Sequence, residues 1–554
     1  MRCFHIDLNH ANPTGPRLVS WLRELAVLGY DSILWEVENA VQWDTCPECA
    51  TPDAFTKDEF RAILATAAQL GLRAIPLFQT LGHCEYVLKH PAYMHLAELP
   101  GRIEQYCPNH PALLPFLQRW ISEHVELFGA AQRLERFHVG MDEAVLFGKC
   151  PLCAAEAARS GEEGLFARHL QAVIAPLLAH GITPLIWADM ALAHLQTIDV
   201  LPREVELCDW NYFTWAGKER AWVWSRRHPQ TLHNEPIDPR TLTPDEHARF
   251  APDLWPHGAD RPHDPCYTAH HLARRGFGVI ACPTTSCYSD NVFAPRFRDK
   301  LNNTVTWVRA GAQADLRGSI VTSWTVHQHP WELQRQAIEA GALALRFPDE
   351  SADQLAERHI ASRFGCPPAP LLRAWDLLSE PCLFTQVQTL DYSKTTLPAD
   401  PRGALRRLAT LAGQGALATE LARAEQRGRE YAEALALLDQ SRREARDGHA
   451  ILAWWQLAAR NLINRAAVAA LLLRWQVGNE TTIAAGPLLS ELRALRLETA
   501  RAYLALGTKQ QRLLQQLDWL YGSVEAALEL AATGAMPQRP AAVVPSGRTA
   551  AASA

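Results

Sequence analysis

The sequence lacks an excess of basic charge and has no long apolar run. Its 554 residues include 54 Lys and Arg against 60 Asp and Glu, a formal net charge of −6. An extended nucleic-acid surface would need a basic excess, so we expect no nucleic-acid partner. The longest apolar stretch, residues 466–473, is far too short to span a bilayer, so we also expect no membrane partner.

A secretory leader is also missing, because no charged segment and long apolar run precede the first strand-like residues, 4–8. We therefore expect a soluble, cytoplasmic protein. In that compartment the 13 cysteines are expected to be reduced thiols or metal ligands rather than a disulfide framework.

Short β-like runs alternate with amphipathic helical stretches over residues 1–345. Eight candidate strands can be counted, at residues 4–9, 32–39, 73–80, 136–143, 184–190, 204–212, 278–287 and 318–325. Strand–helix alternation implies parallel pairing, and eight such units predict an α/β fold, the (β/α)8 TIM barrel. An open doubly wound sheet is the rival fold, but no Gly-rich phosphate turn follows the first strand.

Three further segments depart from this alternation. Residues from about 213 to 277 are rich in Pro and His and are predicted to form a long insertion after the sixth strand. Over residues 350–535 strand signals stop and apolar residues recur at helical spacing, which predicts an α-helical bundle domain. Residues 537–554 are rich in Pro, Ala, Ser and Gly and are expected to be a disordered tail.

Two adjacent acids end the fourth candidate strand. Neighbouring side chains of a strand point to opposite faces, so Asp142 and Glu143 can serve one site only if the chain turns out of the strand there. The carboxyl end of a barrel strand offers such a turn, and Gly140 eases it. A nearby ionised carboxylate raises the pKa of an acid, which suits protonation of a leaving oxygen in glycoside cleavage. The alternative is a helix N-terminus where both acids offset the dipole.

The residues around these acids resemble a known family. The similarity is to the His-Xaa-Gly-Xaa-Asp-Glu signature of glycoside hydrolase family 20, the β-N-acetylhexosaminidases, and is carried by His138-Val139-Gly140-Met141-Asp142-Glu143. Further segments resemble the hexosaminidase D branch of that family, namely His5-Ile6-Asp7-Leu8, residues 75–91, residues 185–190 and Thr322-Ser323-Trp324. The resemblance runs in order across about residues 1–335 and does not obviously cover the helical part.

This resemblance implies an exo-acting, retaining enzyme that uses substrate assistance and needs no cofactor for catalysis. In that family the 2-acetamido oxygen of the substrate attacks the anomeric carbon and forms an oxazolinium ion. By resemblance, Glu143 is the general acid and then the base, and Asp142 orients the acetamido nitrogen. The implied partner is a small glycoside or oligosaccharide with a terminal β-linked GalNAc or GlcNAc.

Supporting residues are expected at the other strand ends. The resemblance places His83 in the catalytic carboxylate network, although a lone His is more often a structural hydrogen-bonding group. Glu36 and Glu38 share one face and are either site acids or solvent-facing acids, and Glu38 could complete an acid–His–acid relay with His83. The expected substrate-binding residues are Asp7, Glu36, Glu38, Trp187, Asp189, Trp210, Tyr212, Trp324 and Glu332.

Among these, the three Trp residues would wall the N-acetyl group, and the alternative for each is barrel core. Tyr212 is expected to bind the acetamido oxygen, and Glu332 an outer hydroxyl. One departure concerns an Arg that many family members carry after the first strand. The run here is Asp7-Leu8-Asn9-His10, without Arg, which leaves the preference for GalNAc or GlcNAc open, with a slight leaning to GalNAc.

Two Cys-Xaa-Xaa-Cys pairs follow the second and fourth candidate strands. Cys46, Cys49, Cys150 and Cys153 could supply four thiolates to a tetrahedral structural zinc, because both pairs leave the same barrel face, two strands apart. Cys107 could replace one ligand. The alternatives are unliganded reduced thiols and a redox-active pair.

Two other function classes stay open. The chain could be a carbohydrate-binding barrel with weak or no turnover, or a zinc-stabilised scaffold whose helical domain acts on a partner. Binding alone does not need a buried acid pair, which favours the hydrolase. The helical domain could cap the barrel or form a homodimer.

Overall fold

The computed structural model describes residues 1–9, 12–193, 196–225, 233–258, 262–325, 329–390, 402–478 and 484–533. The chain forms two compact units. The first comprises Met1–Tyr288, Pro295–Pro368 and Gly507–Lys509, and the second comprises Ser289–Ala294, Ala369–Leu506 and Gln510–Ala554. The predicted disordered tail, residues 537–554, lies outside the described residues.

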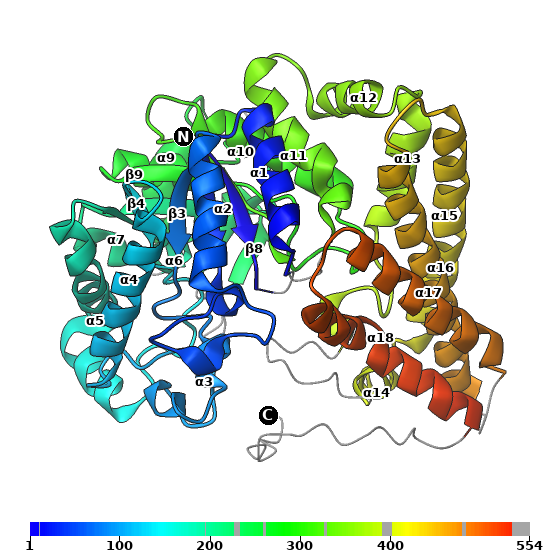
Figure 1. The fold of residues 1–554 in the computed structure, drawn as a ribbon, viewed down its shortest axis with the longest axis horizontal. Helices are drawn as coiled ribbons and strands as arrows, with labels where there is room; N and C mark the ends of the chain where they lie inside the picture. Colours follow the sequence, from blue (N-terminus) through cyan, green and yellow to red (C-terminus); the bar gives the residue numbers. More distant parts are fainter. Residues whose placement is uncertain are drawn as a thin grey trace. The chain divides into compact units, whose positions relative to one another are not determined.

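Eight parallel strands close into a barrel in the first unit (Figure 1). Their order around the barrel is β1-β2-β3-β4-β5-β6-β9-β10, and β10 pairs with β1. The strands are β1 Arg2–Asp7, β2 Ser32–Glu36, β3 Arg73–Leu77, β4 Arg136–His138, β5 Thr183–Trp187, β6 Glu206–Trp210, β9 Gly278–Cys282 and β10 Ser319–Val321. The predicted (β/α)8 barrel is confirmed, and each of the eight candidate strands contributes to it.

Several strands end earlier than their apolar runs suggest. The fourth candidate strand was expected to continue to Glu143, but β4 ends at His138. The backbone leaves the sheet at Gly140 and Met141, where φ is +70° and +78°, values incompatible with a strand. The apolar residues past the strand ends therefore line the loops at the carboxyl face of the barrel.

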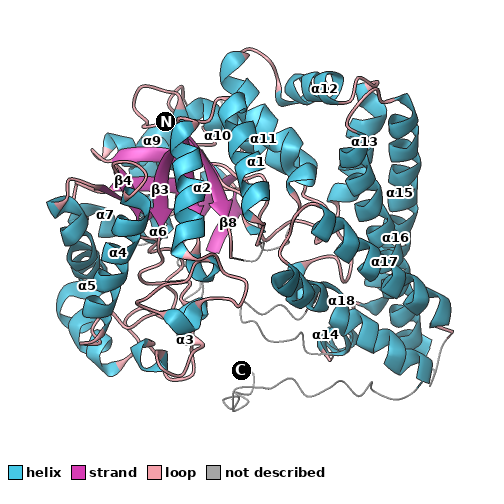
Figure 2. Cartoon of the chain, viewed as in Figure 1, coloured by secondary structure: helices cyan, strands magenta, loops and turns pink. Residues whose placement is uncertain are grey.

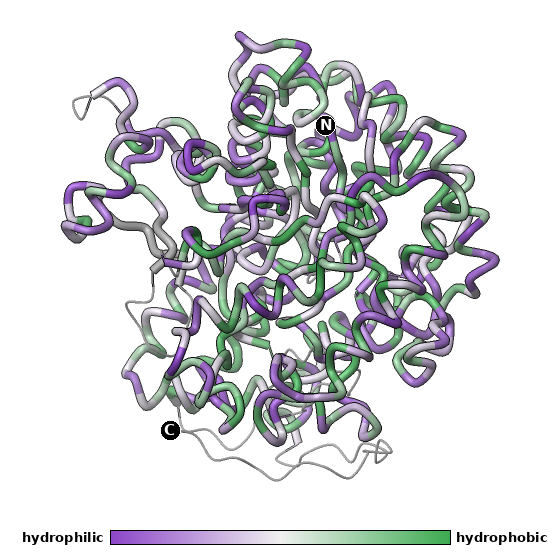
Figure 3. Tube along the Cα trace, turned by 90° about the vertical axis from the view of Figure 1, so that its left-hand side faces the viewer, coloured by the Kyte–Doolittle hydropathy of each residue, from purple (hydrophilic) through white to green (hydrophobic). Residues whose placement is uncertain are grey.

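Apolar side chains from seven of the eight strands fill the barrel interior. They are Cys3, Leu34, Ile75, Leu77, Leu185, Trp187, Cys208, Ile280, Cys282 and Ile320. Alternation along each strand directs these residues inward, and burying one such side chain contributes about 1.5–3 kcal/mol relative to exposure. Figure 3 shows hydrophobic residues gathered in the interior and hydrophilic residues on the outer turns.

Helices cover the outside of the barrel (Figure 2). Helix α2, Lys57–Gln69, shows how the sequence specifies them. A capping box of Thr56 and Glu59 satisfies its first N–H groups, and its apolar residues recur on one face. Phe60 on that face packs edge-on against Trp35 of β2, with ring centroids 5.4 Å apart.

The other helices of the first unit are α1 Gly15–Leu28, α3 Glu85–Leu88, α4 Leu113–Gly129, α5 Pro151–Ala179, α6 Asp189–Ala193, α7 Thr197–Val200, α8 Pro244–Leu254, α9 Tyr267–Arg274, α10 Phe297–Gly311, α11 Trp331–Arg346 and α12 Ala352–Arg363. Short 3-10 turns occur at Glu38–Ala40, Pro47–Cys49, Met94–Leu96 and Pro239–Thr241. No helix among the described residues is long and apolar enough to cross a membrane.

The segment after β6 contains regular structure within residues 213–277. A two-stranded antiparallel sheet pairs β7 Ala221–Ser225 with β8 His233–Ile237, and α8 and α9 follow it. Helix α9 leads into β9, and its Thr268 Oγ1 donates a hydrogen bond of 2.6 Å to Asp209 Oδ2 of β6. Burial raises the pKa of Asp209 to about 7.

The second unit is helical, so the α-helical C-terminal part of the predicted fold is confirmed. Its helices are α13 Pro368–Ser379, α14 Gly403–Gly413, α15 Leu417–Glu444, α16 His449–Gly478, α17 Gly486–Ala505 and α18 Gln510–Thr533, with a 3-10 turn at Val387–Thr389. Trp375 and Trp455 pack together in its core, with ring centroids 5.4 Å apart. The buried Arg465 donates from Nη2 to the carbonyl oxygen of Leu520 at 2.6 Å, and its guanidinium lies 4.8 Å from the ring centroid of Tyr521.

Candidate active site

Nearly all the predicted site residues lie at the carboxyl ends of barrel strands. The structure places them at the end of, or shortly after, β1 (Asp7), β2 (Glu36 and Glu38), β3 (His83), β4 (Asp142 and Glu143), β5 (Trp187 and Asp189), β6 (Trp210 and Tyr212) and β10 (Trp324). Because the strands are parallel, these ends share one face of the barrel. This is the face on which TIM barrels carry their active sites.

A tight turn after β4 brings the two acids to one side of the chain. Gly140, Met141 and Glu143 all have positive φ, and the N–H of Gly140 donates to Nδ1 of His138 at 3.0 Å. A Cβ at Gly140 would collide with the side chain of Gln79, so only glycine fits there. The turn is therefore specified by the His-Xaa-Gly part of the motif.

Backbone strain is concentrated around these acids. Among the described residues, five non-glycine residues have positive φ, and four of them are Glu38, His83, Met141 and Glu143. Each left-handed residue of this kind costs about 1–2 kcal/mol, which the surrounding fold must offset. A Cβ at Gly82 would also collide with the main-chain carbonyl oxygen of Asp142, so the loops after β3 and β4 touch through backbone.

One imidazole bridges the acid pair. His83 Nε2 lies 3.1 Å from Asp142 Oδ2 and 3.3 Å from Glu143 Oε2. The side chain of Asp142 is 8% exposed, whereas that of Glu143 is 45% exposed. The arrangement therefore holds one buried and one solvent-reachable carboxylate against the same ring nitrogen.

A third carboxylate completes the cluster. Asp189 Oδ2 accepts a hydrogen bond of 2.9 Å from the backbone N–H of Glu143. Burial, and then the charges of Asp142 and Glu143, raise the pKa of Asp189 well above its usual value. Asp142 Oδ1 and Asp189 Oδ1 are buried and accept no hydrogen bond from the described part of the chain. Two buried acceptor oxygens are thus left for a ligand or water.

The acids of β1 and β2 have protein partners. Glu36 Oε2 lies 2.9 Å from His5 Nε2, and Asp7 Oδ2 accepts from both the N–H and the hydroxyl of Thr325 at 2.9 Å. Burial, and then the charge of Glu36, raise the pKa of Asp7 to about 6. Asp7 thereby anchors the loop that carries Trp324. His5 was not predicted as a site residue, although it lies within a motif that carries the resemblance.

Glu38 is buried at the start of the 3-10 turn after β2. After burial itself, its charge is the largest influence that raises the pKa of Tyr86, and it also raises that of Cys84, the neighbour of His83. The carboxylate therefore lies in the same region as His83. Its part in a relay stays a prediction.

Aromatic side chains form a continuous group beside the acids. Trp187 is fully buried, and its ring centroid lies 4.3 Å from that of His138 and 5.7 Å from that of Trp324. Trp210 stacks on Tyr212 with centroids 5.0 Å apart, and Trp324 Nε1 donates to the Tyr212 hydroxyl at 2.7 Å. Burial keeps the pKa of Tyr212 far above its usual value, so the phenol retains its proton.

Glu332 lies in the first turn of α11, and a cation missed by the sequence analysis holds it. Arg17 Nη2, near the start of α1, donates to Glu332 Oε1 at 2.6 Å, and both side chains are largely buried. Glu332 Oε2 is buried and accepts no hydrogen bond from the residues described. Arg17 lies in α1, beyond the run Asp7-Leu8-Asn9-His10 that contains no Arg.

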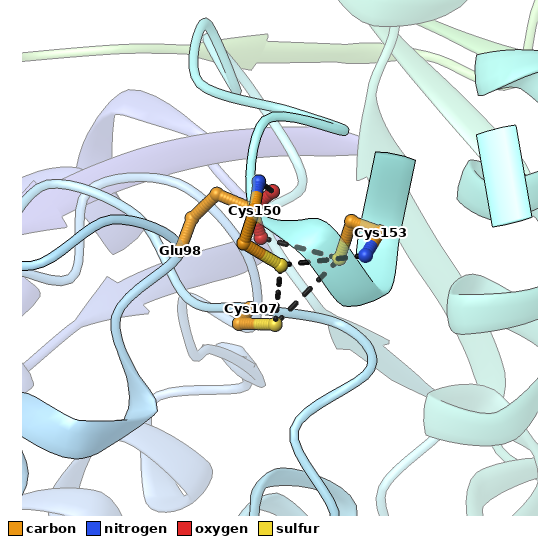
Figure 4. Close-up of side chains that lie close together, drawn as sticks. All are labelled: Glu98, Cys107, Cys150 and Cys153. Atoms are coloured by element: carbon orange, nitrogen blue, oxygen red, sulfur yellow. Dashed lines mark hydrogen bonds between the residues drawn. The ribbon is translucent and has the colours of Figure 1, made fainter. Parts of the chain in front are cut away.

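The predicted zinc ligands are partly wrong. Cys46 and Cys49 form a disulfide, so they are neither reduced thiols nor available as ligands. The 3-10 turn at Pro47–Cys49 brings the two sulfurs together. The neighbours of Cys150 and Cys153 come from the loop after β3. Cys107, Cys150 and Cys153 lie together with Glu98, as Figure 4 shows.

Comparisons with known proteins agree with the geometry. Residues 35–223 match the family model for the catalytic domain of glycosyl hydrolase family 20. Hexosaminidase D of Homo sapiens is 32% identical over 204 residues, which are 34% of this chain and 40% of that protein. Hexosaminidase D of Bos taurus is 31% identical over 200 residues, which are 34% of this chain and 56% of that protein. The match thus spans about half or less of these relatives.

Among solved structures, a β-N-acetylhexosaminidase from Bacteroides fragilis is 15% identical, with a TM-score of 0.43 over 62% of this chain and 65% of that one. An exo β-N-acetylglucosaminidase from Vibrio harveyi is 16% identical, with a TM-score of 0.44 over 65% of this chain and 57% of that one. The strand order of the closed barrel establishes the fold without these likenesses.

Proposed function

We propose that this chain, whose residues 35–223 match the family model for the catalytic domain of glycosyl hydrolase family 20, is an exo-acting β-N-acetylhexosaminidase that releases terminal β-linked GalNAc or GlcNAc. The observation that carries the proposal is the acid pair after β4. Asp142 and Glu143 meet the same nitrogen of His83, one buried and one half-exposed. A binding protein has no need of such a strained and charged turn.

Asp142 is proposed to orient the substrate's acetamido group. Its Oδ2 is held by His83, while its Oδ1 is buried and receives no hydrogen bond from the described residues. An acetamido N–H would satisfy this oxygen and would place the acetamido oxygen for attack on the anomeric carbon. Developing positive charge on the amide would be stabilised by the carboxylate, which makes the contact stronger in the transition state than in the ground state.

Glu143 is proposed to act as general acid and then as base. In the first step the acetamido oxygen bonds to the anomeric carbon, the bond to the leaving oxygen breaks, and the Glu143 proton passes to that oxygen. In the second step Glu143 takes a proton from water as the water oxygen attacks the anomeric carbon and the oxazolinium ring opens. Two inversions give net retention. Solvent access to Glu143 suits both the departing group and the incoming water.

His83 and Asp189 are proposed to stabilise the negative charge of the acid pair. The His83 N–H can donate to either carboxylate as the proton on Glu143 comes and goes. The raised pKa of Asp189 favours a proton on that third acid, which limits repulsion within the cluster. Glu38 is proposed to complete the relay behind His83.

The aromatic group is proposed to hold the N-acetyl group and the sugar ring. Trp210 and Trp324 are partly buried and provide flat apolar surface, whereas Trp187 lies fully buried in the barrel core behind them. The protonated Tyr212 hydroxyl can donate to the acetamido oxygen. That hydrogen bond would polarise the nucleophile toward the anomeric carbon.

Outer hydroxyls are proposed to bind at Glu332 together with Arg17. The pair presents a guanidinium and a free carboxylate oxygen, which match the donors and acceptors of vicinal hydroxyls. Asp7 and Glu36 are proposed to act as positioning residues. Asp7 holds Thr325 by a hydrogen bond, and Glu36 holds His5.

The proposed reaction uses no cofactor, because the substrate supplies the nucleophile and Glu143 supplies the proton. A metal held by three thiolates and a carboxylate has no open position for substrate, so such a metal would act structurally.

The test uses chromogenic β-GalNAc and β-GlcNAc substrates with the wild type, Glu143→Gln and the control Glu126→Gln on the exposed face of α4. We expect turnover of the wild type and the control, and a loss of about 10²–10⁴-fold in kcat for Glu143→Gln. The loss should shrink for a more acidic phenol leaving group, which needs less protonation. Sugar binding without turnover in the wild type would instead support the carbohydrate-binding alternative.

A further inference from the structure

A compact group of metal-ligating side chains lies outside the proposed active site. Glu98 and Cys107 come from the segment between β3 and α4, Cys150 is the N-cap residue of α5, and Cys153 lies in the first turn of that helix. All four are buried, and one ligand atom of each lies within 4.8 Å of all the others. Figure 4 shows their side chains pointing toward a common point.

The spacing of the ligand atoms fits a tetrahedral centre. Cys107 Sγ lies 3.4 Å from Cys150 Sγ and 3.6 Å from Cys153 Sγ, and Glu98 Oε2 lies 3.3 Å from Cys153 Sγ. Four ligands placed tetrahedrally about 2.0–2.3 Å from a zinc ion are separated by roughly 3.5–3.8 Å. The three separations given above lie within a few tenths of an ångström of these values, and all the other pairs lie within 4.8 Å.

Hydrogen bonds from the backbone preset the ligands. Glu98 Oε1 accepts from the N–H groups of Lys149 and Cys150 at 2.7 and 2.9 Å, which leaves Oε2 directed at the thiols. The N–H of Cys153 donates to Cys150 Sγ at 3.3 Å, so the chain also supports negative charge on that sulfur. Outer hydrogen bonds of this kind orient metal ligands.

Without a cation, weak hydrogen bonds hold the cluster together. The Cys153 thiol donates to Glu98 Oε2, and Cys107 shares S–H contacts with Cys150 and Cys153. A thiol is a weak donor, whereas a bound cation would pair with the buried carboxylate and with ionised sulfurs directly. An odd number of thiols also cannot be satisfied by disulfide pairing alone. Three soft sulfur ligands select zinc over magnesium or calcium.

We propose that Glu98, Cys107, Cys150 and Cys153 bind one structural zinc ion. This ligand set differs from the one expected from the sequence. It keeps one Cys-Xaa-Xaa-Cys motif, Cys150 and Cys153, and takes its other two ligands from the segment after β3. This claim concerns metal binding alone and stands independently of the proposed hydrolase activity.

The zinc would clamp together the two loops that carry the candidate catalytic residues. Cys107 follows the segment that leaves His83, and Cys150 follows Glu143 by seven residues. Between them, Gln105 Oε1 already accepts from the N–H of Leu146 at 2.8 Å. The ion would close this junction and fix the distance between His83 and Glu143.

The first measurement is the metal content of the full-length chain purified without chelator, by inductively coupled plasma mass spectrometry. We expect about one zinc per chain in the wild type and in Cys46→Ser/Cys49→Ser, the pair suggested by the sequence. Cys107→Ser/Cys153→Ser should fall to background, while Cys266→Ser, a buried cysteine elsewhere in the barrel, should keep the metal.

A second measurement locates the site without relying on variants that could fail to fold. The wild type is alkylated with iodoacetamide before and after chelation, and the labelled cysteines are identified by mass spectrometry. Chelation should expose Cys107, Cys150 and Cys153 to labelling and leave Cys266 unchanged. Cobalt(II) added to the stripped, reduced chain should produce the charge-transfer absorption of thiolate ligands.

Three results would overturn the proposal. They are an absence of zinc together with no thiolate–cobalt absorption, retention of stoichiometric zinc in folded Cys107→Ser/Cys153→Ser, and a labelling pattern that chelation does not change at the three cysteines. If Cys46→Ser/Cys49→Ser lost its zinc while Cys107→Ser/Cys153→Ser kept it, the metal site would lie at Cys46 and Cys49.

Discussion

Replacement of Asp142 by Asn tests how the carboxylate handles the substrate amide. Asn keeps the size of the side chain but removes its charge and gives one of its two terminal positions hydrogen-bond donors. In the wild type, Oδ2 meets His83 Nε2 at 3.1 Å and Oδ1 is buried without a partner among the described residues. The Asn amide must therefore turn its NH2 toward either His83 or the acetamido N–H.

The magnitude follows from the hydrogen bond that is lost. A hydrogen bond to a charged group contributes about 1.5–3 kcal/mol, and a buried donor left facing another donor costs about 1–3 kcal/mol more. The sum, roughly 3–6 kcal/mol, corresponds to a decrease of about two to four orders of magnitude in kcat/KM. The bulk of this loss should appear in kcat, because the contact strengthens as the oxazolinium forms.

The assay compares 4-nitrophenyl substrates that carry N-acetyl, N-difluoroacetyl and N-trifluoroacetyl groups. Fluorine makes the acetamido oxygen a poorer nucleophile, so the wild-type rate should fall steeply along this series. Asp142→Asn should lose at least about a hundredfold on the N-acetyl substrate and depend less steeply on fluorination. A loss below tenfold, or an unchanged series in the wild type, would refute the reasoning, and thermal unfolding of the variant controls for misfolding.

Three further predictions follow from the same structure. Gly82→Ala should lower kcat at least tenfold and destabilise the protein by about 1–3 kcal/mol, because its Cβ collides with the Asp142 carbonyl; a fully active variant would contradict this contact. Burial raises the pKa of Asp209 to about 7 in the folded state, whereas an unperturbed Asp has a pKa of about 3.9. Between these values the native state holds a proton that the unfolded state releases, so the free energy of unfolding falls as pH rises, by about 4 kcal/mol at most. Asp209→Asn should therefore gain stability over the wild type between pH 5 and pH 8 in urea titrations, and a difference that does not change with pH would argue against it. Trp324→Phe removes the donor to the Tyr212 hydroxyl and should raise KM for N-acetyl substrates several-fold, with Phe retaining the apolar surface; an unchanged KM would place this pair outside the sugar site.

The barrel could be predicted because its signal is local. Each strand is a short apolar run, and each following helix repeats its apolar residues at helical spacing, as in α2. Parallel pairing then follows from the alternation, and the position of the site follows from the fold. The sequence also indicated that the chain turns at Gly140, since two adjacent acids cannot otherwise share a site.

The site features that could not be predicted from the sequence depend on contacts between residues far apart in the chain. Arg17 and Glu332 are 315 positions apart, and no local pattern links a helix start to a carboxylate in α11. The positive φ at His83 and Glu143 arises from loop packing. It could not be predicted from the residue types, because neither residue is glycine. The same applies to Asp189, whose pKa is raised by burial first and then by the charges of Asp142 and Glu143.

The cysteines show how a motif can mislead. Two Cys-Xaa-Xaa-Cys pairs suggest one four-thiolate site, but Cys46 and Cys49 are bonded to each other. The side chains that lie beside the second pair are Cys107, which the sequence offered as a replacement ligand, and Glu98, which no sequence pattern indicated. Spacing identified the motif, and the folded loops added the carboxylate.

The central claim is that Asp142 and Glu143 assist an attack by the substrate's own acetamide, and a crystal structure with a GalNAc- or GlcNAc-thiazoline tests it most directly. We expect the thiazoline ring nitrogen to lie within hydrogen-bond reach of Asp142 Oδ1, and Glu143 to lie beside the anomeric carbon on the solvent side. A thiazoline that binds away from these two carboxylates, or that neither binds nor inhibits, would contradict it.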